Sequence, residues 1–198
     1  MEKIECPQCG YPLPIYFRYS KLAVCPSCKS TIFLEDESAR LSGKSSVLSE
    51  EPSLLKLYRP FSYDRRGFTP VGHIRYRSGR FAWDEWRLVD NRGKEWWISV
   101  DDGDYILEKK VPFSLEIESF ETLRLGSEVG EWRVTELGEG ICEGFEGEFP
   151  NIVKEGERHR FVHLSGKGRI MLTAEFFDDV KELYEGRWID PYEIWARM

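Results

Sequence analysis

The sequence predicts a mainly β protein, with a small four-cysteine zinc ribbon at its N-terminus followed by an antiparallel β-sandwich or barrel-like domain. Three observations lead to this prediction: two Cys-x-x-Cys pairs in the first 34 residues, an aromatic content of 14%, and turn signals at short intervals beyond residue 54. Aromatic side chains fit pleated surfaces, and short strands at close spacing are typical of sandwiches and barrels. A chain of 198 residues is long enough to bury a hydrophobic core in one or two domains.

Composition divides the chain into three regions. Residues 1–34 hold four of the five cysteines, and residues 35–53 are rich in Ser, Glu and Lys, which is the composition of a flexible linker. Residues 54–198 are dense in aromatic residues and glycine. We therefore expect a ribbon, a linker and one β-rich domain, in that order.

The four N-terminal cysteines predict a metal site. They form the pairs Cys6/Cys9 and Cys25/Cys28, with fifteen residues between the pairs. Two such turns placed face to face give the tetrahedron of thiolates that Zn²⁺ accepts, and four thiolates leave no open position for a catalytic water. Bound zinc would supply the folding free energy that so short a segment lacks, so we expect a structural ion. A redox dithiol pair, an iron site and a cysteine framework used only when oxidised are the alternatives.

Charge and hydropathy limit the partners of the chain. The formal net charge is -7, which disfavours a protein that binds the phosphate backbone of nucleic acids. Nucleic-acid binding through the ribbon nevertheless stays an alternative. The ribbon aromatics could stack on bases, but their mostly alternating placement favours packing; they are Tyr11, Tyr16, Phe17 and Tyr19. No apolar run approaches the roughly 20 residues that span a bilayer, and the N-terminus lacks an apolar signal core. We expect a cytoplasmic protein, with its thiols reduced.

Alternating segments separated by turn signals predict the strands of the main domain. Turns are expected at Ser78-Gly79, at 90–93 and at 101–104, and strands between them. The second half repeats this texture, and Leu55-Lys56-Leu57 and Leu123-Arg124-Leu125 open the two halves alike, so the domain could contain two similar halves. A helix of at most about two turns is expected after Asp190-Pro191.

The segment Phe81-Ala82-Trp83-Asp84-Glu85-Trp86 is unusual for a strand. Period-two alternation places Phe81, Trp83 and Glu85 on one face and Asp84 and Trp86 on the other. Two bulky rings on opposite faces mean that both faces are covered, or that one ring lines a groove. Core packing with a buried, satisfied carboxylate is favoured, and a partner-binding surface is the alternative.

A second unusual segment runs from Cys142 to Pro150. It carries the carboxylates Glu143, Glu146 and Glu148 with two glycines. Paired carboxylates can perform acid–base chemistry or bind a hard cation, but a solvated turn with a glycine bulge is favoured. Cys142 is expected to be a buried structural thiol, and the three histidines to be ordinary surface or core residues; these are His73, His159 and His163.

Several blocks in this order resemble a known family. They are Phe68 to Tyr76, Trp83-Asp84-Glu85-Trp86, Trp96-Trp97-Ile98, Glu146 to Pro150 and Tyr184 to Trp188. Residues 54–189 are similar to the bacterial "domain of unknown function 4178" family, whose members often carry an N-terminal Cys-x-x-Cys ribbon. The resemblance implies a β-rich domain and an accessory role in an envelope-stress or polyamine-linked system, but no reaction and no catalytic residues.

The function expected from the sequence is a non-enzymatic accessory or scaffold protein that binds a protein partner. Its expected binding residues are Trp83, Asp84, Glu85, Trp86, Glu146 and Glu148, because aromatic anchors dominate interface energies. The alternatives are a nucleic-acid-binding ribbon protein and an enzyme that uses Glu143, Glu146 or Glu148 with a bound cation.

Overall fold

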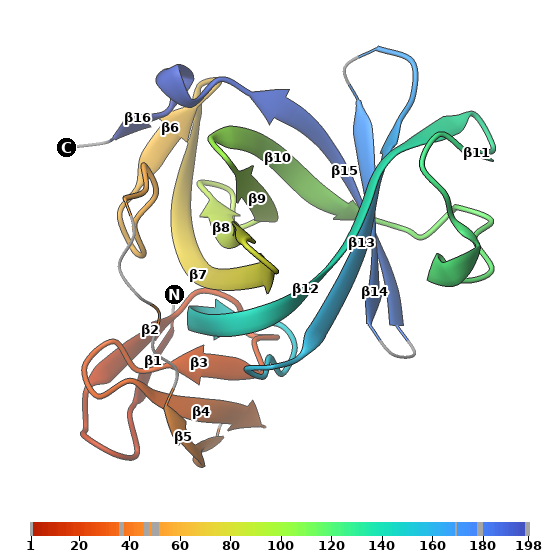
Figure 1. Cartoon of the computed structure of the whole chain (residues 1–198). Helices are drawn as coiled ribbons and strands as arrows, with labels where there is room; N and C mark the ends of the chain where they lie inside the picture. Colours follow the sequence, from red (N-terminus) through yellow and green to blue (C-terminus); the bar gives the residue numbers. More distant parts are fainter. Residues whose placement is uncertain are drawn as a thin grey trace.

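An eight-stranded antiparallel barrel forms the centre of the protein (Figure 1). The structure is a computed structural model that describes residues 2–35, 38–45, 48, 52–168, 170–177 and 180–196. The barrel strands are β7 (Arg66–Ser78), β8 (Phe81–Asp90), β9 (Glu95–Asp101), β10 (Asp104–Val111), β12 (Trp132–Phe149), β13 (Arg158–Ser165), β14 (Met171–Phe177) and β15 (Val180–Ile189). The antiparallel barrel-like fold predicted from the turn spacing is confirmed.

Two four-stranded meanders make up the barrel. Strands β7 to β10 form one and β12 to β15 form the other; β10 pairs with β15 on one side, and β7 pairs with β12 on the other. The barrel thus has two halves of the same topology. The two leucine-containing segments that precede the halves also behave alike, since Leu55 and Leu123 are both buried in apolar clusters.

Strand β12 is the longest described strand and pairs with four others, of which β11 (Glu128–Val129) joins it only at its first two residues. Its first part pairs with β13, its second part with β7, and its last two residues with β3 of the ribbon. A register shift between Cys142 and Gly144 bends the strand where it changes partner, as bulges commonly do. Gly147 has a φ of +86° and lies so close to β7 that a Cβ there would be 2.1 Å from the Val71 carbonyl oxygen.

The apolar side chains of the barrel strands point mainly outward, under covering segments. One cluster joins Leu88, Ile98 and Leu107 to β6 (Phe61–Tyr63). A second cluster, over the other half, is covered by the connection from β10 to β12, which includes the 3₁₀ turn η1 (Phe120–Thr122) and β11 (Glu128–Val129). The inward positions carry polar and aromatic residues together with a third apolar cluster, which includes Ile74, Tyr76 and Trp83.

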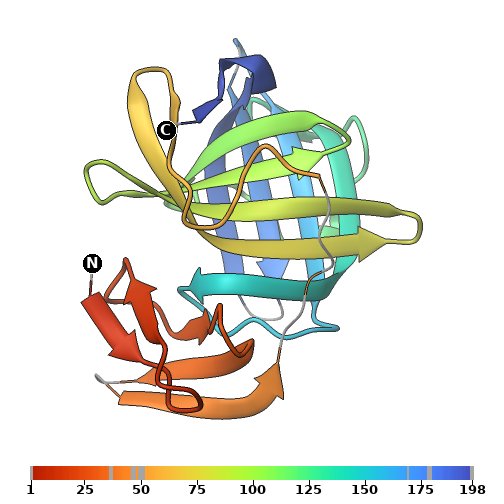
Figure 2. The ribbon, with the colours of Figure 1, turned by 90° about the vertical axis from the view of Figure 1, so that its left-hand side faces the viewer.

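The N-terminal ribbon lies beside the end of β12 (Figure 2). It contains the hairpin of β1 (Glu2–Glu5) and β2 (Pro12–Ile15), and the antiparallel strands β3 (Leu22–Val24), β4 (Ser30–Glu35) and β5 (Ser38–Ser45). Residues 38–45, which composition assigns to a linker, form a strand that pairs with β4. Backbone pairing with a neighbouring strand outweighs the polar composition of this segment.

Arg87 of β8 joins the ribbon to the barrel. Its side chain is fully buried and donates to the Ser20 hydroxyl at 3.0 Å, to the Glu148 carbonyl at 3.1 Å and to Glu95 at 2.7 Å. The guanidinium group also lies 4.4 Å from the centre of the Phe17 ring. Such a buried, fully bonded guanidinium fixes the ribbon against one side of the barrel.

A single 3₁₀ turn, rather than an α-helix, follows β15. This turn, η2 (Pro191–Glu193), is preceded by Asp190, whose carboxylate accepts from the Tyr192 amide at 2.9 Å. The chain then returns to the sheet, because β16 (Trp195–Ala196) pairs with β6. Within the described part of the chain, no helix has the length and apolar character needed to cross a membrane.

We expect Gly147→Ala to destabilise the protein by about 2–4 kcal/mol, because the new methyl group would strike the backbone of Val71 in a left-handed conformation. Gly103→Ala is the matched control: it has a φ of +90° but open space around its Cα, so it should cost only about 1 kcal/mol. Urea unfolding of both variants measures the difference. Equal losses would show that close approach of β12 and β7 is unimportant.

Candidate functional site

Four cysteine sulfurs converge in the ribbon. The Sγ atoms of Cys6, Cys9, Cys25 and Cys28 all lie within 4.8 Å of one another, and the Cys6–Cys28 and Cys9–Cys25 distances are both 3.7 Å. A tetrahedral zinc site with Zn–S bonds of about 2.3 Å has S–S edges of about 3.8 Å. The predicted cluster is therefore present, and its Cys6–Cys28 and Cys9–Cys25 distances match the edges of a tetrathiolate metal site.

The two turns that carry the cysteines have the same hydrogen bonds. The Gly10 amide donates to the Cys6 carbonyl at 2.8 Å, and the Lys29 amide donates to the Cys25 carbonyl at 2.9 Å. Gly10 has a φ of +72° and Lys29 a φ of +60°, so the second turn uses a lysine in the left-handed conformation. These paired turns aim all four thiols at one point.

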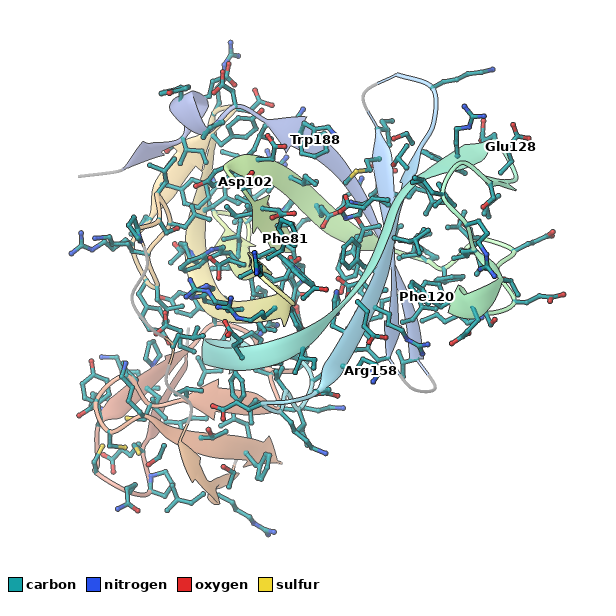
Figure 3. All side chains as sticks on the ribbon, in the orientation of Figure 1. Phe81, Asp102, Phe120, Glu128, Arg158 and Trp188 are labelled. Carbon is teal, nitrogen blue, oxygen red and sulfur yellow. The ribbon has the colours of Figure 1, made fainter. Side chains whose placement is uncertain are left out.

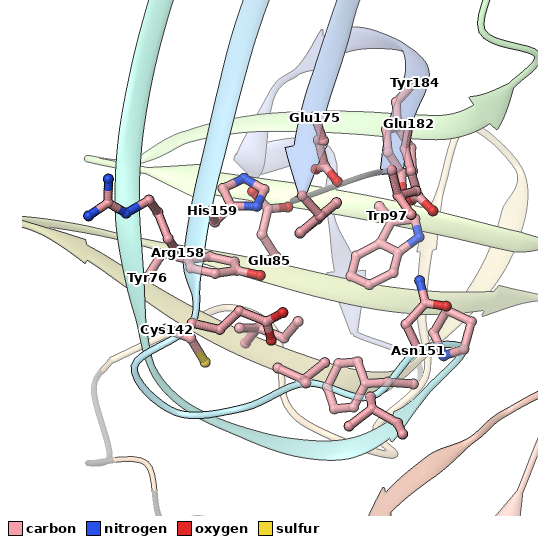
Figure 4. Close-up of a pocket in the computed structure, with 18 of the residues that line it drawn as sticks. Tyr76, Glu85, Trp97, Cys142, Asn151, Arg158, His159, Glu175, Glu182 and Tyr184 are labelled. Carbon is pink, nitrogen blue, oxygen red and sulfur yellow. The ribbon is translucent and has the colours of Figure 1, made fainter. Parts of the chain in front are cut away.

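The lumen of the barrel is a second candidate site, and it is lined by ionisable groups. A cavity of about 240 Å³ lies at the end near the β12–β13 connection, and another of about 140 Å³ lies toward the other end. Glu85, Glu108, His159 and Glu175 line both cavities. Figure 4 shows several of the labelled side chains around the larger cavity, among them Glu85, Glu175, Trp97 and Tyr184.

The lumenal carboxylates resist ionisation. Burial raises the pKa of Glu85 and of Glu175 well above the ordinary value, and the neighbouring carboxylates raise both further. Burial also raises the pKa of Glu108, although the Thr173 hydroxyl bonds to its carboxylate and opposes the shift. Among the described residues, no Lys, Arg or His forms a salt bridge with these three groups. Two further carboxylates, Glu157 and Glu182, line the larger cavity, and Glu182 pairs with Lys110 at 2.5 Å.

His159 faces the same lumen as a neutral ring. Its side chain is 3% exposed, and burial lowers the pKa of its imidazole to about 3. The ring stacks on Tyr76 with centroids 4.4 Å apart. Its Nδ1 atom is buried and has no hydrogen-bond partner within the described structure, which is unusual for a buried polar atom.

Both tryptophan rings of the segment from 81 to 86 are buried. Trp83 is 9% exposed, lies in the lumen and packs against Gly140, where a Cβ would be 2.1 Å from its Cη2 atom. Trp86 is 3% exposed on the outer face and stacks on His73 at 3.8 Å. The period-two assignment is correct, and so is the favoured interpretation that both rings are packed. The expectation that these rings are exposed partner-binding anchors does not hold, because the closed barrel and its outer cover bury both faces of β8.

Asp84 belongs to a charged cluster on the outer face. It accepts from His73 Nε2 at 2.8 Å and from Arg75 Nε at 2.8 Å, while His73 Nδ1 lies 3.4 Å from Glu146. Burial acts to lower the pKa of His73, but the hydrogen bonds to Asp84 and Glu146 outweigh it and raise this pKa above its ordinary value. Each group has a partner inside the cluster, so the cluster serves to satisfy charges under the covering chain.

The three carboxylates between residues 142 and 150 do not converge. Glu143 pairs with Arg77, Glu146 contacts His73, and Glu148 is fully buried and accepts from the amides of Tyr16 and Phe17. Each serves a different part of the structure, so the geometry expected of a carboxylate-dependent enzyme is not formed by these residues. Cys142 is 2% exposed, and burial raises the pKa of its thiol to about 12, as expected of a structural thiol.

Most of the ribbon aromatics contact the barrel. Phe17 lies under Arg87, Tyr16 stacks on Tyr58 at 6.2 Å, and the Tyr19 hydroxyl donates to Glu95 at 2.5 Å. The packing interpretation is confirmed for Phe17 and Tyr16, whereas Tyr19 stays 53% exposed despite its bond to Glu95. Tyr11 remains 42% exposed.

Most of the lumenal site is not evident from the sequence. Glu85 stands out beside its tryptophans, whereas Glu108, Glu175, Glu182 and Tyr184 do not. The signal that could reveal them is a carboxylate between apolar neighbours in a strand, as in Leu172-Thr173-Ala174-Glu175-Phe176. The sequence does not show that the apolar neighbours face outward. A carboxylate between them is therefore interpreted as an ordinary solvent-exposed residue.

Comparison with known proteins adds a family but no activity. A family model described as "Domain of unknown function (DUF4178)" matches residues 60–191. No curated protein and no solved structure matches the chain. The matched range covers the whole barrel, from β7 through β15, and more than half of the sequence. The chain therefore belongs to the DUF4178 family.

Proposed function

We propose that the protein is a binding protein that encloses a small ligand in its barrel lumen and uses zinc to hold its ribbon. The lumen carries this proposal, since pockets that bind small molecules are concave, apolar on most sides and supplied with a few polar groups. The larger cavity has this character: Trp97, Tyr76 and Tyr184 line it beside the carboxylates.

Zinc would have a structural role. Four thiolates complete its coordination, and the reduced thiols that the site needs fit a cytoplasmic protein. The ribbon they hold contributes the β3 partner of Glu148 and Phe149, and the backbone donors for the Glu148 carboxylate. The metal would thereby fix the last stretch of chain before the β12–β13 connection.

A side chain of a protein partner is the second candidate ligand for the barrel lumen. Phe81 is 78% and Trp188 54% exposed, and Figure 3 labels both together with Asp102. Trp188 and Asp102 line the smaller cavity, and Phe81 shares a strand face with Trp83, which lines it as well. Aromatic side chains at such an opening favour contact with a partner that places one of its side chains in the lumen.

A thermal-shift screen of small cations, anions and neutral molecules tests lumen binding. Asn151→Trp should block the larger cavity from the β12–β13 connection, and it should abolish the shifts given by wild-type ligands. Lys154→Trp, in the same connection but away from the cavity lining, is the control and should retain them. Ligands that still stabilise Asn151→Trp, or a complete lack of ligands, would contradict the proposal.

We expect one zinc ion per chain, and its removal should unfold the ribbon but leave the barrel folded. Structural zinc contributes on the order of 10 kcal/mol to small domains, whereas the barrel has its own apolar clusters. Hydrogen exchange after chelation should show lost protection in β1 to β4 and retained protection in β8 and β9. Cys25→Ser should lower the zinc content, and Cys142→Ser should not. Full ribbon protection in the metal-free protein would disprove a structural role.

We expect Glu175→Gln to stabilise the ligand-free protein at high pH. A raised carboxyl pKa means that the folded state holds its proton more tightly than the unfolded chain, so stability present below pH 4.5 is lost as the pH rises. The variant should therefore melt about 3 °C above wild type at pH 8 and close to it at pH 4.5. Glu185→Gln, on the outer face and paired with Lys109, should change the melting temperature little at either pH. A destabilised Glu175→Gln at pH 8 would contradict this account.

A further inference from the structure

The lumen holds more negative groups than its own cations can neutralise. The larger cavity is lined by one cation, Arg158, which pairs with Glu139. It is also lined by five carboxylates, of which the described residues give only Glu182 a salt-bridge partner, Lys110; the five are Glu85, Glu108, Glu157, Glu175 and Glu182. A buried carboxylate without a cationic partner is costly to ionise, and a positive ligand would remove that cost. The charge of the site thus favours a cation over a neutral or negative occupant.

A second observation also points to a ligand. The buried Nδ1 atom of His159 lacks a hydrogen-bond partner within the described structure, although the ring lines both cavities beside Glu85 and Glu175. A neutral imidazole offers one acceptor nitrogen, which can receive an N–H donor from a bound group. A ligand that brings several N–H donors would satisfy both the carboxylates and this ring.

The spacing of the carboxylates argues against a bare metal ion. Within the described residues, the cysteine quartet is the only group of three or more ligands close enough to share one ion. Divalent cations such as Ca²⁺ and Mg²⁺ need several oxygens around one point. Carboxylates that are spread along a lumen instead suit an elongated organic cation.

Aromatic faces and charge at the smaller cavity favour the same chemistry. Trp97 and Tyr184 line the larger cavity with their rings in edge-to-face contact at 6.5 Å, and alkyl chains and ammonium groups both bind well against such rings. The smaller cavity is lined by Asp101, Asp102 and Asp104. Clustered negative charge at an opening raises the local concentration of cations.

We propose that the lumen binds a primary alkylammonium group, with Glu85 and Glu175 as its charge partners and His159 as a hydrogen-bond acceptor. The group is carried either by a free small amine or by a lysine side chain of a partner protein. This inference rests on the proposed function, because it names the chemical class of ligand that the lumen encloses.

Isothermal titration calorimetry of the full, zinc-loaded chain tests whether the lumen binds alkylammonium groups. The probes are the α,ω-diaminoalkanes from three to six carbons, 1-aminobutane, 1,4-butanediol and succinate, with Nα-acetyl-lysine methylamide and a lysine-containing peptide as the protein-side arm. Amines should bind, whereas the diol and the dicarboxylate should not. Tighter binding of free amines or of the lysine peptide identifies the source of the group.

Glu175→Gln should weaken amine binding by about tenfold or more. Glu185→Gln, on the outer face of β15, should leave it unchanged. Glu85→Gln is a second lumenal variant, used if Glu175→Gln does not fold.

Two results would overturn the inference. Equal binding of the diol, succinate and the amines, with Glu175→Gln unaffected, would leave lumen binding in place but refute the preference for ammonium groups. Failure of every amine to bind the wild-type protein would also refute the preference for ammonium groups. The thermal-shift experiment with Asn151→Trp tests separately whether the lumen binds any ligand.

Discussion

The pairing of β12 with β7 is the contact on which the rest of the structure depends. It joins the two four-stranded meanders on their second side, and a closed barrel has no exposed sheet edge between them. The closure requires two backbones to approach where no side chain fits: at Gly147, beside Val71, and at Gly72, where a Cβ would lie 2.7 Å from the Glu148 carbonyl oxygen. The same strand then continues into the ribbon, so one stretch of chain closes the barrel and positions the N-terminal module.

Because many apolar side chains of the closed barrel face outward, polar side chains face its lumen. Because Leu88, Ile98 and Leu107 pack under β6, and Val162, Leu172 and Leu183 under the β10–β12 connection, the alternating positions between them face inward. Those inward positions carry Glu85, Glu108, Glu175 and Tyr184. Much of the apolar packing of the domain thus lies outside the barrel, although a further cluster with Ile74, Tyr76 and Phe149 lines the lumen, and the other inward positions hold charged groups that a fully packed core would exclude.

The parts of the structure that were predictable are those encoded by neighbouring residues. The Cys6/Cys9 and Cys25/Cys28 spacing predicts the metal site because each turn brings its own two ligands, and the parity of Trp83 and Trp86 follows from the two-residue repeat of any strand. What could not be predicted depends on distant parts of the chain. Alternation alone does not say which face is inside, so Glu175 could not be distinguished from a surface carboxylate. Composition also suggested a linker where β5 pairs with β4, and a solvated turn where Glu148 is buried under the ribbon.

Phe149 is the last residue of β12, and the residues that follow it, Pro150 to Val153, line the larger cavity. Phe149 itself pairs with Leu22 of the ribbon on one side and lines the cavity on the other. Any displacement of the ribbon must consequently move one wall of the larger cavity. If the cysteines hold zinc and the lumen holds a ligand, as we propose, the two binding events would be thermodynamically linked, and loss of the metal would change the affinity of the lumen for its ligand.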